Sequence, residues 1–307
     1  MPTDNDQDGR YGLTSPYIIK VDFGGLPTSG LAIGLVYESA LREGQNDSLS
    51  GIFSLNMRAV SRQLHFNNRL PPMEALFEPQ KLREPKFSLT SPRHGDPISA
   101  QTSKLTLGGL GEEAAGYNIT YGPVFIYNYN DFPLDCQGWT VQLEGVRING
   151  VEIKMTNGLI LPEGKYLSMT DSGRSLMYFR PEELDAIATQ FKGLIVYSGN
   201  RDVCFDCSIP QLMELKYFGE WYAVDPLDLV IPSDHGFVNG TQYCHAALGR
   251  RAFAGSIIGP PFLRSVVSVF DYLSSDLVPQ PRVGLAGLVN GAAAVARYPD
   301  VLPHRLL

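Results

Sequence analysis

Residues 257–271 read Ile-Ile-Gly-Pro-Pro-Phe-Leu-Arg-Ser-Val-Val-Ser-Val-Phe-Asp, and residues 281–286 read Pro-Arg-Val-Gly-Leu-Ala. Upstream of both, residues 171–175 read Asp-Ser-Gly-Arg-Ser, after a strand-like run at 166–169 and before a helix that begins at Pro181. A D-S-G triplet alone is a weak signal, because chance supplies it in a fair share of chains this long. Its combination with the two later stretches is far more specific.

The composition favours a turn-rich β protein. The 307 residues include 31 glycines and 22 prolines, more than an average domain holds, and only 19% are charged. Apolar residues make up 44%, which excludes intrinsic disorder. A formal net charge of -7 argues against nucleic acid and anionic membranes as partners. No apolar run is long enough for a membrane span, and the first residues lack the apolar core of a secretory signal.

Local patterns point the same way. Residues 18–23 and 31–36 are predicted strands around a glycine-rich turn, and residues 139–153 alternate with period two up to the hairpin turn Asn149-Gly150. One clear helix is predicted, from Pro181 to Phe191, with proline in its first turn. Many short strands and few helices predict a mostly β fold.

The stretches at 171–176, 257–271 and 281–286 strongly resemble the C-terminal lobe of pepsin-like aspartic proteases. In that family D-T/S-G-T/S-S is followed by I-L-G-D-x-F-L-R-x-x-Y-V-V-F-D and then R-I-G-L-A. Residues 21–26 resemble the strand V-x-F-G-G-L after the family's flap, and residues 51–55 resemble its G-I-L-G-L. The resemblance implies a mostly β, pepsin-like bilobal fold. Its expected parts are an incomplete N-terminal lobe at 1–130, a complete C-terminal lobe at 131–290 and a C-terminal tail at 291–307.

The resemblance also implies an aspartic-type endopeptidase that needs no metal or cofactor. Two aspartates, one per lobe, share a proton and activate a water against the peptide bond, because two such close carboxylates cannot both ionise. Asp171 is the catalytic candidate, with Ser172, Gly173 and Ser175 supporting its loop. It is the one D-S/T-G aspartate in the sequence, and the matched strands begin near Ile18. We therefore expect the first catalytic aspartate to be missing and proteolysis by this chain alone to be absent or impaired.

Three departures from the family pattern support an alternative. The flap motif would align at residues 6–10, which puts Asp6 where the family has tyrosine. Arg174 replaces a small hydroxyl residue, and Pro260 replaces the aspartate of L-G-D. A guanidinium favours an ionised carboxylate, whereas a working dyad needs a shared proton. The alternative is a non-proteolytic pepsin-fold protein, a monomer that binds a peptide or small molecule in the inter-lobe cleft, with a possible accessory role in biosynthesis.

The cysteines allow two interpretations. Cys204, Cys207, Cys244 and His245 together could supply four zinc ligands. The resemblance instead implies a disulfide between Cys207 and Cys244, which we favour over zinc. Sequons at three positions are candidate glycosylation sites, and the family resemblance implies a secreted or vacuolar protein. These asparagines are Asn46, Asn118 and Asn239.

Overall fold

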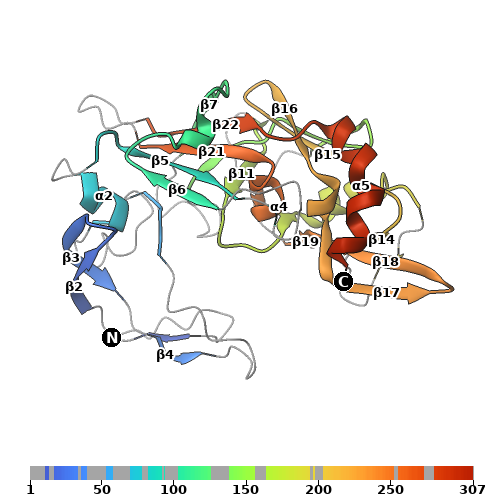
Figure 1. Ribbon diagram of the computed structural model, residues 1–307, viewed down its shortest axis with the longest axis horizontal. Coiled ribbons are helices and arrows are strands. Elements are labelled where there is room, and N and C mark those ends of the chain that lie inside the picture. The colour runs from blue at the N-terminus through green and yellow to red at the C-terminus, as the bar shows by residue number, and fades with distance from the viewer. Residues whose placement is uncertain are drawn as a thin grey trace. The chain divides into compact units, whose positions relative to one another are not determined.

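The computed structural model describes most of the chain, in segments that form two compact units, Met1–Glu84 and Pro85–Leu307 (Figure 1). The described residues are 11–13, 17–33, 36–39, 53–57, 70–77, 82–91, 93, 103–125, 138–155, 164–193, 196–197, 203–251, 255–272 and 280–306. Asp6, Asn46 and Cys136 lie outside them. The boundaries expected from the sequence, at 130/131 and 290/291, stay a prediction.

The first unit contains two small antiparallel sheets. Its elements are β1 (Tyr11–Leu13), β2 (Tyr17–Asp22), β3 (Pro27–Ile33), β4 (Val36–Ser39) and the helix α2 (Pro72–Phe77). Strand β1 pairs with β4, and β2 pairs with β3. The turn between β2 and β3 uses Gly24 and Gly25 at φ 63° and 91°, values that favour glycine. A hairpin with a glycine turn is therefore present as predicted, but its second strand is β3 at Pro27–Ile33 instead of 31–36, and Val36 begins β4.

The second unit holds the remaining strands in four sheets. Its strands are β5 (Lys86–Thr90), β6 (Lys104–Leu107), β7 (Thr120–Pro123), β8 (Thr140–Gln142), β9 (Gly145–Ile148), β10 (Val151–Ile153), β11 (Leu167–Thr170), β12 (Met177–Phe179), β13 (Val196–Tyr197), β14 (Val203–Asp206), β15 (Met213–Tyr217), β16 (Glu220–Val224), β17 (Val230–Val238), β18 (Thr241–Ala246), β19 (Leu248–Arg250), β20 (Ser256–Ile258), β21 (Val266–Asp271) and β22 (Arg282–Gly287). Its helices are α3 (Pro181–Ala188), α4 (Pro260–Leu263) and α5 (Gly291–Arg305), with 3-10 turns η2 (Glu112–Ala114) and η5 (Pro226–Leu229). The fold is mostly β, as predicted.

A five-stranded antiparallel sheet in the order β6-β5-β21-β22-β7 joins segments far apart in the sequence. Strand β21 is buried along its whole length, which explains why residues 266–270 are apolar apart from Ser268. A second five-stranded sheet has the order β19-β12-β20-β11-β8 and carries the Asp171 loop. The other two sheets have the orders β10-β9-β15-β16 and β13-β14-β18-β17.

Two local predictions are confirmed in this unit. Asn149 and Gly150 form the turn between β9 and β10, with φ 51° and 86°. The helix α3 begins at Pro181, and it buries Leu184 and Ile187. Its last helical residue is Ala188, a few residues before the predicted end at Phe191.

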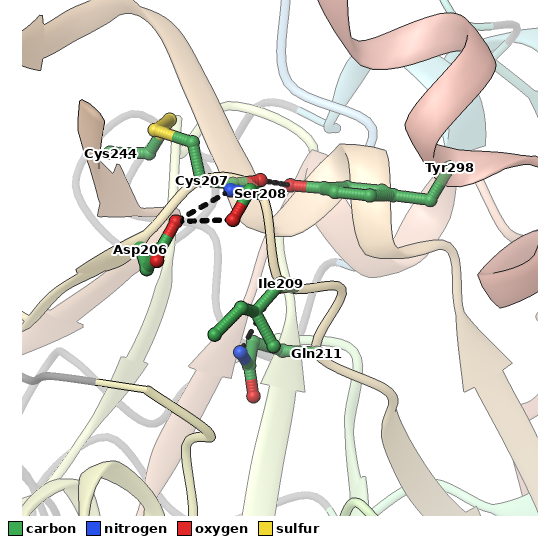
Figure 2. Close-up of a disulfide and its surroundings, with 7 residues drawn as sticks. All are labelled: Asp206, Cys207, Ser208, Ile209, Gln211, Cys244 and Tyr298. Carbon is green, nitrogen blue, oxygen red and sulfur yellow. Dashed lines mark hydrogen bonds between the residues drawn. A yellow bond between two sulfur atoms is a disulfide. The ribbon is translucent and has the colours of Figure 1, made fainter. Parts of the chain in front are cut away.

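A disulfide joins Cys207 to Cys244, with an S–S distance of 2.06 Å, as the resemblance implied (Figure 2). The segment after β22 forms helix α5, which is capped by Asn290 through a hydrogen bond from the Ala293 amide. Tyr298 of α5 is fully buried, and its hydroxyl donates to the Cys207 carbonyl oxygen at 2.8 Å. The C-terminal helix therefore packs directly against the disulfide. No helix in the described part of the chain is long and apolar enough to cross a bilayer.

Candidate active site

Asp171 lies at the end of β11, where the chain leaves the sheet before returning as β12. These two strands do not pair with each other, because β20 lies between them. Strand β20 runs parallel to β11, with Met169 beside Ile257, and antiparallel to β12, with Tyr178 beside Ile257. The loop that carries Asp171 therefore crosses over the end of a strand that comes much later in the sequence.

Backbone contacts fix this crossing. The Asp171 amide donates to the Ile258 carbonyl oxygen at 3.0 Å. A Cβ atom on Gly259 would lie 2.5 Å from the Leu176 carbonyl oxygen and 2.8 Å from that of Arg174. Because the loop backbone passes so close, glycine is required directly after β20. This close approach explains the Ile-Ile-Gly sequence at 257–259.

The Asp171 carboxylate is held by its own loop and remains accessible to solvent. Its Oδ1 accepts a hydrogen bond from the Gly173 amide at 2.9 Å. Its Oδ2 lies 3.7 Å from Arg174 Nε, and the Asp171 side chain is 31% exposed. Ser172 and Ser175 are exposed on the same loop. The structure thus brings all four predicted motif residues together on one turn and leaves the carboxylate open to a reactant.

Aromatic packing anchors the residue before Asp171. Both the amide and the hydroxyl of Thr170 donate to the Trp139 carbonyl oxygen, at 3.0 and 2.7 Å. The Trp139 ring packs edge-on against Phe270 and Tyr272, at centroid distances of 5.1 and 4.8 Å. Phe87 stacks on Phe270 at 4.7 Å. Trp139 therefore connects strand β11 to the other five-stranded sheet, β6-β5-β21-β22-β7, which contains Phe270 and Phe87.

A buried hydroxyl pair lies beneath the same strand. Ser168 Oγ and Tyr217 Oη are 2.9 Å apart, and both residues are fully buried. Burial raises the pKa of Tyr217 well above its usual value, so the phenol stays neutral at physiological pH. Each hydroxyl satisfies the other, which removes the cost of burying an unpaired polar group.

Sequence reasoning missed a buried ionic cluster elsewhere in this unit. Arg93 Nε contacts Asp228 Oδ2 at 2.6 Å, and Arg93 Nη1 lies 3.5 Å from Asp225 Oδ2. Arg297 of α5 also contacts Asp225, and Arg264 lies 3.8 Å from Asp228. Both aspartates are 1% exposed. Only Arg264 belongs to a motif, the F-L-R of residues 262–264, and the other members are scattered along the chain, so no sequence signal indicated that they meet.

The zinc alternative does not fit the structure. Cys207 and Cys244 are joined as a disulfide, so neither offers a thiolate to a metal ion. Cys204 lies buried in β14 opposite His245. Among the described residues, no group of three or more His, Cys, Asp or Glu side chains could hold a metal ion.

Comparison with known proteins identifies the family. A family model described as eukaryotic aspartyl protease matches residues 16–286. The chain belongs to the eukaryotic aspartyl protease family. The match includes the Asp171 loop, β20 and the five-stranded sheet, so the family resemblance read from the sequence is confirmed.

Two relatives from Aspergillus fumigatus illustrate the similarity to this family. A probable aspartic-type endopeptidase is 26% identical over 238 residues, which cover 74% of this chain and 52% of the relative. The aspartic-type endopeptidase ctsD is 21% identical over 146 residues, or 47% of this chain and 28% of the relative. The chain thus spans about half the length of the first relative and less of the second.

Proposed function

We propose that this chain acts in peptide-bond hydrolysis as an aspartic-type endopeptidase, with Asp171 as one of two catalytic aspartates. The supporting observation is the position of its carboxylate on the β11–β12 loop. One oxygen accepts the Gly173 amide at 2.9 Å while the side chain stays partly exposed to solvent. Family membership supports the same reaction.

The chemistry requires a second carboxylate opposite Asp171. With one proton shared between the two acids, the ionised carboxylate takes a proton from water while the protonated one donates to the substrate carbonyl oxygen. The D-S/T-G motif occurs once in these 307 residues. We therefore expect the 307-residue polypeptide alone to be inactive or strongly impaired, and active when a second aspartate faces Asp171.

The proposed substrate is a peptide or protein bound by a monomer between its two lobes. The proposed location is outside the cell or in the vacuole. The Cys207–Cys244 disulfide supports a secretory route, because disulfides persist in oxidising compartments and are rare in the cytosol.

The test measures casein cleavage at acidic pH with and without pepstatin. Asp171→Asn should lower any cleavage by about a thousandfold or to background, since it removes a group that takes part in proton transfer. The matched control is Asp300→Asn, an exposed aspartate on α5, which should leave cleavage unchanged. Pepstatin-sensitive cleavage that persists in Asp171→Asn would rule out the catalytic role.

A second experiment addresses the missing carboxylate. Mapping the 5′ end of the transcript should show whether an in-frame D-T/S-G is encoded upstream, and that longer protein should cleave casein where the 307-residue chain does not. If the transcript encodes no such motif and the chain is silent, the endopeptidase proposal fails.

The second candidate function is binding of a peptide or small molecule without hydrolysis. Arg174 favours it, because an arginine stands where the family has a small hydroxyl residue and its Nε lies 3.7 Å from Asp171 Oδ2. Pepstatin binding measured by calorimetry in a chain that cleaves nothing would support this alternative.

A further inference from the structure

The hairpin of β17 and β18 projects from the second unit and ends in a tight turn (Figure 1). The turn residues Asn239 and Gly240 have φ 50° and 81°, so both adopt the left-handed conformation typical of a two-residue hairpin turn. Val238 pairs with Thr241 across the turn. The three residues 239–241 form the sequon Asn-Gly-Thr at the tip of the hairpin.

The same tip exposes two large apolar side chains. Phe237 is 71% exposed and Val238 is 48% exposed. No other large apolar residue in the described part of the chain is as exposed as Phe237. Leaving an aromatic ring in water forfeits the free energy that its burial would supply, so a covering group would stabilise the hairpin.

We propose that Asn239 carries an N-linked glycan whose first N-acetylglucosamine packs on the exposed ring of Phe237. The group that covers this exposed apolar surface is thus the sugar attached to the neighbouring asparagine. Asn239 is exposed, as the modification requires. This inference rests on the proposed secretory location, which the disulfide between Cys207, directly after β14, and Cys244 of β18 supports, because such glycans are added in an oxidising compartment.

The modification is a group transfer from a lipid-diphosphate-linked oligosaccharide, catalysed by the host's oligosaccharyltransferase. A bond forms between Asn239 Nδ2 and the anomeric carbon of the sugar. The bond from that carbon to the diphosphate breaks, the lipid diphosphate leaves, and the amide nitrogen loses one proton.

Asn118 provides an internal contrast. Its sequon, residues 118–120, leads directly into β7, where Thr120 pairs with Leu285 of β22. Ile119 packs against the buried residues Val267 and Val269. This sequon is therefore built into the five-stranded sheet, whereas the Asn239 sequon stands on a free hairpin tip. A glycan on Asn118 is not expected to couple to Phe237.

The first measurement is glycopeptide mass spectrometry on the full chain, secreted from a eukaryotic host behind the host's own leader. We expect Asn239 to be occupied, and Asn239→Gln, but not Asn118→Gln, to remove that glycan. Secreted, folded protein with unmodified Asn239 would overturn the proposal.

The second measurement tests the packing. Unfolding is followed for wild type and Phe237→Ala, each with its glycans and after enzymatic removal. The glycan should increase the folding equilibrium constant of wild type roughly three- to tenfold, the range for one aromatic contact, and that of Phe237→Ala by clearly less. Equal gains in both would overturn the packing.

Sedimentation completes the test. A glycosylated protein that dimerises, and becomes monomeric in Phe237→Ala, would assign the tip to a second copy of the chain and overturn the proposal. A monomer at all concentrations supports it.

Discussion

Two aspartate–arginine arrangements in the second unit differ in burial. On the β11–β12 loop, Asp171 and Arg174 are 31% and 38% exposed and 3.7 Å apart. In the buried cluster, the side chain of Asp228 is fully buried and lies 2.6 Å from Arg93 Nε. The same two chemical groups are therefore exposed to solvent on the Asp171 loop and buried in the cluster around Asp228.

The difference separates a carboxylate that solvent can reach from buried carboxylates that hold the fold. Exposed ion pairs contribute little to stability because water screens them. Removing one partner of a buried pair is costly, because the remaining charge is left without a partner and without solvation by water. The cluster around Asp228 ties α5 and residue 93 to η5, whereas the Asp171 loop relies on backbone contacts and leaves its carboxylate available.

The largest effect is expected when the buried arginine is removed. Arg93→Met should lower the free energy of unfolding by about 3–5 kcal/mol, because it leaves the carboxylates of Asp228 and Asp225 with fewer buried cations. Urea denaturation followed by tryptophan fluorescence measures the change. A loss below about 1 kcal/mol would mean that water enters the cluster, and the contrast in burial would not hold.

The disulfide comes next. Replacing Cys207 and Cys244 together by serine opens a loop with a sequence separation of 37 and should cost about 2–4 kcal/mol. Tyr298→Phe removes the hydrogen bond to the Cys207 carbonyl oxygen and should cost about 1 kcal/mol.

If the disulfide holds that carbonyl in place for Tyr298, the two losses will not be additive. The tyrosine substitution should then cost clearly less in the chain without the disulfide. Fully additive losses would show that α5 packs independently of the bridge.

The smallest effect belongs to the exposed arginine. Arg174→Met makes the same chemical change as Arg93→Met but should alter the free energy of unfolding by no more than about 0.5 kcal/mol. The same urea titration compares the two variants directly. A loss as large as that of Arg93→Met would show that Arg174 supports the loop structurally.

Local signals in the sequence predicted local structure well. Asn149-Gly150 specifies a tight turn because both residues accept positive φ, and the turn is present. Pro181 marks the start of α3 because proline fits the first helical turn. The Asp171 loop was found through a resemblance, since nothing local to residues 171–175 specifies that β20 lies beside β11.

Features that depend on distant residues escaped prediction. The Arg93 cluster joins four separate segments, each with ordinary surface-type residues. Helix α5 was expected only as a tail, and the structure accommodates Pro299 and Pro303 inside it. The N-cap residue Asn290 was the one available signal for its start.

The insertion of β20 between β11 and β12 sets an order of events during synthesis on the ribosome. Met169 needs Ile257 as its neighbour, and residues 170–256 are all translated between them. Pairing between residues so far apart is slow and cannot precede their synthesis. A nascent chain that stops before residue 256 therefore lacks the strand that supports Asp171, so the turn that carries Asp171 can be assembled only after β20 has been synthesised.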